Sequence, residues 1–444
     1  MRMRRLAAVA ATGLLVAPSA QAQHEDHARR AAPPATVGPA GRPSGLELSP
    51  RDLQADPMGV LGRRMSLHGS GTSWQPESSP MGMEMRMQGA WLWQLHGNGM
   101  LSWNGASGPR GYGELSFPNW GMLMGSRVLG AGILDLRAMG SLDPFTTPPG
   151  GTAQLFQTGE SFGGRPLVDR QHPHDLFMEL AGRYTVPLAT GSAVFFYGGP
   201  VGEPALGPNA YMHRASAADN AMAPLSHHLQ DSTHIAMGVL TGGLQWNRWQ
   251  LEGSWFRGKE PDENRSNIDF GPLDSVAARL SLSPSRNWVM QLSSGYLTNP
   301  EELEPGDLVR STASLHHNQP MPFGNWASSL VWGQNRELAE APIEVSNSML
   351  VESTLDWAAR NHAYGRYEGV DKEGLGGGIP GGPISRIHAL TLGLIRDVRL
   401  EPVVIGVGGD VTLHAMPAEL EPSYGAMPLS FRVFVRMRPP HRGH

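Results

Sequence analysis

The chain of 444 residues carries 40 acidic and 35 basic side chains, and its net charge of −5 argues against nucleic acid as a partner. It contains no cysteine, which excludes a disulfide framework and a thiolate metal site. No stretch after the N-terminal segment is long and apolar enough for a membrane-spanning helix, so a membrane protein of this composition would have to be a β-barrel.

The N-terminal segment, residues 1–22, predicts a secretory signal peptide. Basic residues at its start precede a short apolar run, and the sequence Ala-Gln-Ala predicts cleavage near Ala22. Residues 23–80 are polar and rich in proline, glycine, serine and arginine without a sustained period. They predict a flexible arm that is either disordered or plug-like, with 69–80 a candidate plug.

Residues 90–438 consist of segments in which apolar and polar side chains alternate, which is the pattern of half-exposed strands. In WQLEGSW (249–255), for example, Trp249, Leu251 and Trp255 share one face. Such segments predict about 16 strands, at 90–103, 114–126, 130–141, 175–187, 191–199, 232–244, 247–258, 272–283, 286–297, 308–318, 324–334, 347–358, 361–369, 385–397, 401–413 and 427–438.

Short turns alternate with long connections between these segments, and tryptophan and tyrosine lie near their ends. Both features are typical of outer-membrane barrels with tight periplasmic turns, longer external loops and aromatic girdles. We therefore expect an all-β fold: a transmembrane antiparallel up-and-down β-barrel of about 16 strands (range 14–18) in the bacterial outer membrane. The alternative is a soluble β-sandwich or propeller, although no repeat of propeller length is present.

The polar face of the predicted strands would line the lumen of such a barrel. Charges of both signs on that face predict a porin-like channel for a small polar solute or metal ion, open or plugged. The candidate pore-lining residues are Asp135, Arg137, Glu252, Arg279, Glu352, Asp356, Asp410, Arg432 and Arg436.

Several blocks resemble a family of largely uncharacterised bacterial outer-membrane β-barrel proteins. They include GSGTSWQP (69–76), DRQHPHDLFMEL (169–180), PLSHHLQDSTHI (224–235) and GNWASSLVWGQNRE (324–337). The resemblance implies an exported barrel and a loose association with copper and heavy-metal handling, without an assigned reaction or site residues. Its partners would be outer-membrane lipid and the barrel assembly machinery, the latter through Phe431 or Phe434.

Two histidine-rich segments end the two longest connections and are expected to meet at one rim of the barrel. Imidazole nitrogens and a carboxylate suit Cu²⁺ or Zn²⁺, the possible cofactors, and a metal-binding or resistance accessory protein is the alternative function. The competing interpretation is a polar latch, in which Asp169, Arg170 and Asp175 tie the loop down. The candidate ligands are His172, His174, Asp175, His213, His227, His228 and His234, with Asp231 beside them.

Two weaker patterns remain. Met81, Met83, Met85 and Met87, preceded by Met65 and His68, offer soft sulfur ligands for Cu(I), but methionines at this spacing also serve as adaptable packing. The N-terminal residues His24 and His27 could bind metal weakly.

An enzyme is not expected, because the hydrolase motifs GxSxG and HExxH are absent. The less favoured alternative is an outer-membrane hydrolase that uses Ser232, His234 and Asp231.

Overall fold

The structure, a computed structural model, describes residues 65–439 apart from 190, 221, 339–343, 377–381 and 401–402. The predicted signal peptide, residues 23–64 of the predicted arm, and His24 and His27 lie outside the described residues. Within the described part of the chain, no helix has the length and apolar character needed to cross a membrane.

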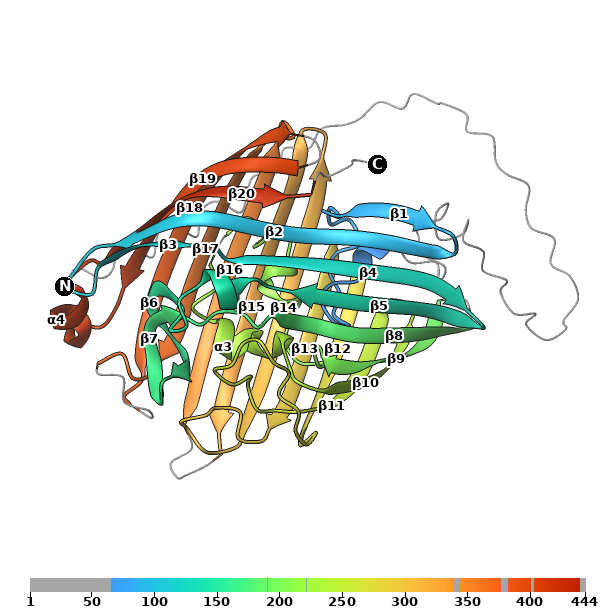
Figure 1. Ribbon diagram of the computed structural model, residues 1–444, viewed down its shortest axis with the longest axis horizontal. Coiled ribbons are helices and arrows are strands. Elements are labelled where there is room, and N and C mark those ends of the chain that lie inside the picture. Colours follow the sequence, from blue (N-terminus) through green and yellow to red (C-terminus); the bar gives the residue numbers. More distant parts are fainter. Residues whose placement is uncertain are drawn as a thin grey trace, which may run out of the picture. The chain divides into compact units, whose positions relative to one another are not determined.

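The dominant element is one antiparallel sheet that closes on itself (Figure 1). Its strands are β1 (Glu84–Gln88), β2 (Trp91–Ala106), β3 (Tyr112–Ser116), β4 (Asn119–Leu129), β5 (Gly132–Gly140), β8 (Phe177–Ala189), β9 (Ser192–Val201), β10 (Val239–Trp246), β11 (Trp249–Phe256), β12 (Ser275–Ser285), β13 (Trp288–Leu297), β14 (Leu308–Met321), β15 (Gly324–Glu337), β16 (Val345–Trp357), β17 (Asn361–Lys372), β18 (Ser385–Leu400), β19 (Val403–Ala415) and β20 (Leu429–Arg438).

The wall of this barrel contains 16 strands, as predicted. On one side of β2, β3 and β4 follow each other along the same edge, because β4 pairs with residues 92–99 and β3 with residues 102–106. On the other side, β1 pairs with 91–95 and β20 with 99–106, which closes the ring between the last strand and the first. The prediction of an all-β antiparallel barrel is confirmed.

Short turns and long connections alternate around the ring and define two rims. At the short-turn rim, Asn247 adopts a positive φ of 49° in the two-residue turn between β10 and β11, a conformation that asparagine tolerates in hairpins. The long-loop rim carries the connections 141–176, 202–238, 257–274 and 298–307. One predicted strand is wrong in part: residues 232–238 fold inside the barrel, beginning with the 3-10 helix η3 (Ser232–His234), and the wall resumes only at Val239.

The wall has an apolar outside and a polar inside. In β11 the side chains of Trp249, Leu251 and Trp255 are exposed, whereas Gln250 and Glu252 are buried. The same inversion holds in β18, where Leu390, Leu392 and Leu394 are exposed. Near the C-terminus, Phe431 faces outward and Phe434 packs inside with Met100 and Tyr364. A soluble β-sandwich or propeller would bury these apolar faces, so that alternative is wrong.

Three segments fill the lumen. Residues 65–80, with η1 (Met65–Leu67), enter it: Thr72 donates to the Glu252 carboxylate, and its carbonyl accepts from Gln250 at 2.8 Å. The connection 141–176 contributes the hairpin β6 (Thr152–Phe162) and β7 (Arg165–Gln171). It begins with α2 (Asp143–Thr146), in which Phe145 is 69% exposed.

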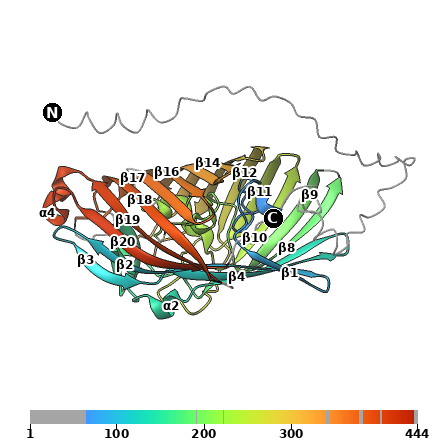
Figure 2. The ribbon, with the colours of Figure 1, turned by 90° about the horizontal axis from the view of Figure 1, so that it is seen from above.

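The third segment, the connection 202–238, is called the internal segment below. It carries η2 (Tyr211–His213), α3 (His227–Gln230) and η3, and most of its residues are buried. Figure 2 shows loops between the two sides of the ring. The only other described helices, η4 (Ala418–Leu420) and α4 (Glu421–Tyr424), lie between β19 and β20.

Candidate functional site

Five histidines from two connections meet inside the barrel below the long-loop rim, and we call them the histidine cluster. Ring centroids lie 5.1 Å apart for His227 and His234, 5.3 Å for His227 and His228, and 5.5 Å for His172 and His228. His174 joins at 5.9 Å from His234. Each of the five is at most 9% exposed. The structure thus brings together the histidines of both sequence motifs.

Acceptors fix the orientation of most of these rings. The Nδ1 atom of His174 lies 3.0 Å from Asp143 Oδ2, and that of His227 lies 2.6 Å from Asp231 Oδ1. His234 Nδ1 lies 2.8 Å from the Asp231 carbonyl oxygen. A histidine whose Nδ1–H is donated to a carboxylate or carbonyl presents the lone pair of Nε2, which is the arrangement found behind metal ligands.

Burial keeps several of these imidazoles neutral. It lowers the pKa of His228 to about 4 and that of His234 to about 3, and it lowers the pKa of His172 well below its ordinary value, with the charge of Arg265 acting in the same direction. A neutral imidazole is the form that binds a metal ion, so these side chains need not lose a proton near pH 7.

The remaining predicted ligands lie elsewhere. Asp175 pairs with Arg265 at 3.4 Å, and Arg265 also donates to Glu160. His213 is separate from the histidine cluster, because its ring packs on Trp120 at 4.8 Å and lies 5.9 Å from that of His96.

The ion pairs of the polar latch also form. Asp169 pairs with Arg110 at 2.8 Å, and Arg170 pairs with Glu114 at 3.4 Å. The two interpretations of the segment are therefore compatible, because its acidic and basic side chains hold the loop while its histidines face inward.

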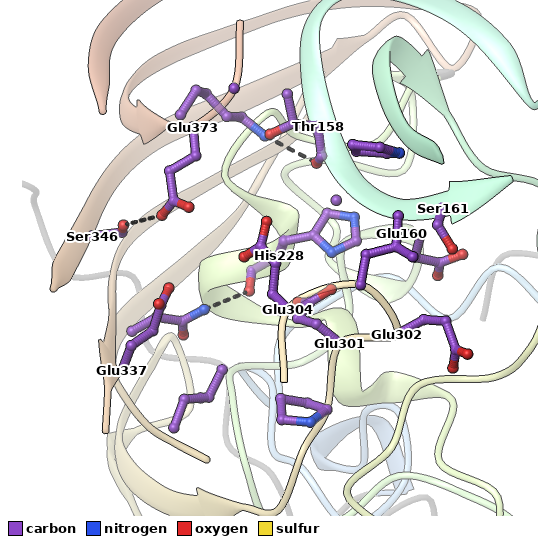
Figure 3. A pocket seen from close by; sticks show the side chains of 18 of the residues that line it. Thr158, Glu160, Ser161, His228, Glu301, Glu302, Glu304, Glu337, Ser346 and Glu373 are labelled. Atoms are coloured by element: carbon purple, nitrogen blue, oxygen red, sulfur yellow. Dashed lines mark hydrogen bonds between the residues drawn. The ribbon is translucent and has the colours of Figure 1, made fainter. Parts of the chain in front are cut away.

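A cavity of about 150 Å³, called the rim chamber, lies beside the histidine cluster. Figure 3 shows the His228 ring in the middle of this chamber, with glutamates around it. The acidic side chains come from β6, from the loop 298–307 and from the rim ends of β15 and β17. They are Glu160, Glu301, Glu302, Glu304, Glu337 and Glu373, with Asp307 and Asp371.

Crowding and burial hold protons on some of these carboxylates. Burial raises the pKa of Glu373 to about 7, and the charges of Glu337 and Glu304 add to the effect. Burial also raises the pKa of Glu301 well above its ordinary value, followed by the charges of Glu260 and Glu304. A cation in the chamber would relieve this repulsion.

Sequence reasoning did not single out the glutamates of the rim chamber. The acidic runs KEPDENR (259–265) and NPEELEPGD (299–307) were the available signal. Nothing in either run indicates that Glu260 and Glu301 approach His228, because the three residues lie in three different connections.

The predicted pore-lining residues all lie on inward faces. Four of the nine contact the internal segment, namely Glu352, Arg436, Arg432 and Arg279. Arg214 of that segment forms an ion pair with Glu352 at 2.7 Å, and Asp219 of the same segment forms one with Arg436. Arg432 pairs with Asp410 at 2.7 Å, and Arg279 donates to Glu252 at 2.8 Å.

The other three, Asp135, Arg137 and Asp356, line a second cavity of about 410 Å³, the inner chamber. This chamber also holds the soft ligands that the sequence suggested. Met81, Met83 and His68 line it together with His96 and His213. In the strand register His96 is opposite Met122, so both side chains share the inner face of the wall. Met122 also packs into a methionine-rich core with Met139, Met178, Met212 and Met237, which are not members of the predicted methionine set.

The serine, histidine and aspartate of the hydrolase alternative do not form a catalytic triad. The Ser232 hydroxyl accepts a hydrogen bond from Arg310 at 2.6 Å, and the His234 ring faces the Asp231 carbonyl oxygen. A nucleophile needs its base within hydrogen-bond reach, and here each partner is bonded to another group.

No protein-family model and no curated protein sequence matches the chain. Solved structures with a similar fold include the anion-selective porin from Comamonas acidovorans (11% identity, TM-score 0.46, 78% of this chain and 99% of that chain). OmpF of Salmonella typhi in complex with daunomycin matches at 9% identity and a TM-score of 0.47, over 80% of this chain and 100% of that chain. At this distance, the description of the barrel rests on the strand register of the chain itself.

Proposed function

We propose that the chain is an outer-membrane barrel of the porin type that admits small cations through a lumen narrowed by its own internal segments. The inverted wall is the observation that carries the membrane location. A closed ring with exposed leucine and tryptophan outside and buried arginine and glutamate inside is stable where hydrocarbon surrounds it, because its strands hydrogen-bond to one another around the ring.

Tryptophans support the same location. Trp246 and Trp249 flank the turn between β10 and β11 and are exposed on the outside, as expected of an interfacial girdle. The short-turn rim would then face the periplasm and the long-loop rim the exterior, with outer-membrane lipid as the surrounding partner. Phe431 is the outward-facing aromatic residue that the barrel assembly machinery would recognise.

The rim chamber supports a cation as the solute. Its lining carries six glutamates and one lysine, Lys372, and a carboxylate-lined cavity at the mouth of a barrel concentrates cations from solution. The inner chamber lies further along the lumen and carries charges of both signs.

Planar-bilayer recording tests this function. We expect small, cation-selective conductance steps from the purified protein, and a weaker preference for cations in the double variant Glu301→Gln, Glu304→Gln. Glu419→Gln, an exposed glutamate in the loop between β19 and β20, is the matched control and should leave selectivity unchanged. Folded protein that inserts into the bilayer without any conductance would remove the channel.

The second candidate is a metal-binding accessory protein, which the internal segment favours because it occupies the lumen and carries three histidines of the cluster. Calorimetric titration with Cu²⁺ and Zn²⁺ separates the two candidates. Metal binding without conductance, lost in the double variant His172→Ala, His228→Ala, would favour this alternative.

A further inference from the structure

We infer that one divalent transition-metal ion binds at the edge of the rim chamber, between His228 and Glu301 of its lining and Glu260 of the adjoining connection 257–274. The inference deepens the proposed function by naming the ion class, and it rests on that function only for the direction of ion flow. One ligand atom from each of the three side chains lies within 4.8 Å of the other two. Ligands about 2.1 Å from a metal ion lie roughly 3–4 Å from one another, so small side-chain movements close the site.

His228 is the observation that points to a ligand. Its side chain is 8% exposed, neither ring nitrogen makes a hydrogen bond, and the nearest charged partner is Glu260 Oε1 at 3.8 Å from Nδ1. Buried imidazoles normally have a partner for at least one nitrogen. An ion placed between the ring and the two carboxylates would supply it.

The cations around the chamber are bonded to other groups. Lys372 donates to Gln157 Oε1 at 2.7 Å, and Arg310 donates to Asn335 Oδ1 at 2.9 Å. Lys259 pairs with Glu302 at 2.6 Å, which sets that neighbouring glutamate apart from Glu301. Arg310 still acts on Glu260 and Glu301 through the charge of its guanidinium group, so it offsets these two carboxylates in part.

The backbone around His228 is shaped to hold the ring. Gly159 on β6 has a φ of 113°, and a Cβ added there would lie 2.6 Å from three atoms of the His228 ring. On the other side of α3, Asn335 donates to the His228 carbonyl oxygen at 3.4 Å. A ligand fixed by its surroundings loses less entropy when it binds a metal ion.

The donor set selects the ion class. One imidazole nitrogen and two carboxylates suit Zn²⁺ and other divalent transition metals, whereas Ca²⁺ and Mg²⁺ prefer oxygen ligands alone. The carboxylates of Glu304, Glu337 and Glu373 lie within 4.8 Å of one another in the same chamber and would attract the ion before it reaches His228.

The test uses the full chain, purified in detergent without a histidine tag, and equilibrium dialysis against Zn²⁺ with Ca²⁺ in excess. We expect about one tightly bound Zn²⁺ per chain, and an affinity loss of roughly tenfold or more in His228→Ala and in Glu301→Gln. Glu419→Gln is the matched control, because it makes the same change at an exposed glutamate outside the rim chamber, in the loop between β19 and β20, and should alter affinity less than about twofold. Migration on a gel before and after boiling confirms that each variant is folded.

X-ray absorption of the zinc-loaded protein provides a second readout, with one imidazole and oxygen ligands expected and the imidazole signal lost in His228→Ala. Zinc affinity that is unchanged in both ligand variants would overturn the inference, and so would the absence of bound zinc from the folded wild type. Zinc binding without ion conductance would support the metal site and contradict the proposed channel function. Ion conductance without zinc binding would support the channel function and contradict the metal site.

Discussion

The carbonyl oxygen of Leu229 in α3 lies so close to Gly333 of β15 that a Cβ on Gly333 would be 2.1 Å from it. The helix that carries two histidines of the cluster therefore touches the wall through a position where only glycine fits. The contact couples the barrel wall to the position of His228, because Leu229 and His228 belong to the same short helix.

Gly333→Ala should displace α3 and weaken the histidine cluster. The added methyl group meets backbone, which cannot rotate away, so we expect a loss of about 1–3 kcal/mol in unfolding free energy and weaker zinc binding. Gly121→Ala is the control, because a Cβ there has nothing within 4 Å. Urea unfolding in detergent micelles measures the first effect and equilibrium dialysis the second. Equal behaviour of the two variants would contradict the contact.

Arg214→Ala should release the internal segment. Arg214 is buried between Asp231 at 2.8 Å and Glu352 at 2.7 Å, so its loss leaves two buried carboxylates with fewer partners. Breaking such a pair costs about 3–5 kcal/mol. We expect a larger single-channel conductance as the segment loosens, together with a lower urea midpoint.

The control for this prediction is Arg286→Ala, which removes an ion pair with Glu77 whose arginine is 55% exposed. An exposed pair is worth at most about 1 kcal/mol, so neither conductance nor midpoint should change much. The proposed role of the internal segment as a fixed constriction fails if Arg214→Ala conducts like the wild type.

Acidification should loosen the internal segment through His234. Burial lowers the folded-state pKa of His234 to about 3 from 6.5, and the charges of His227 and His174 act in the same direction. Below about pH 6.5 the unfolded segment takes up a proton that the folded segment does not, so stability falls as the pH decreases toward 3.

At pH 4.5 this proton uptake increases the equilibrium constant for opening of the segment by at most about 100-fold. Hydrogen exchange of residues 202–238, corrected for the intrinsic exchange rate, measures this increase. His234→Gln should remove the part of the pH dependence that His234 causes, whereas His228 and His213 of the same segment, whose pKa values burial also lowers, keep the rest. Comparing this variant with the wild type also separates His234 from Glu203. Burial raises the pKa of Glu203 to about 8, so protonation of Glu203 at lower pH stabilises the folded segment. A variant that loosens like the wild type would exclude His234 as the cause.

The wall was predictable from the sequence because a barrel strand encodes its two faces directly in alternation. Residues 232–238 alternate in the same way, with Thr233, Ile235 and Met237 on one side, yet these side chains pack inside the barrel and not in its wall. Alternation indicates that one side of an extended segment is buried. It does not indicate whether the segment belongs to the barrel wall or packs inside the barrel. The predicted strand was therefore too long at its N-terminal end.

The candidate site was predictable only in its histidines. The rim position of two loops followed from topology, so their meeting could be expected. The partners of these side chains could not be predicted, because they come from distant parts of the chain. Arg436 and Asp219 are 217 residues apart, and His228 and Glu301 belong to different connections. The inward direction of Arg436 follows from its strand, whereas the residue that neutralises it depends on how a long loop folds in the lumen.

Leu392→Arg tests whether lipid surrounds the wall. Leu392 lies in the middle of β18 and is 60% exposed, so water around the barrel would make the substitution nearly neutral. In a bilayer, an arginine near the midplane on the lipid face costs about 2–4 kcal/mol. Urea titration of the protein folded into lipid vesicles, followed by tryptophan fluorescence, measures this difference. Phe270→Arg is the control, because Phe270 is 79% exposed in the loop 257–274 and its replacement should change the free energy by less than about 0.5 kcal/mol. If both variants fold into vesicles as stably as the wild type, the exposed apolar face does not contact hydrocarbon, and the outer-membrane location loses its support.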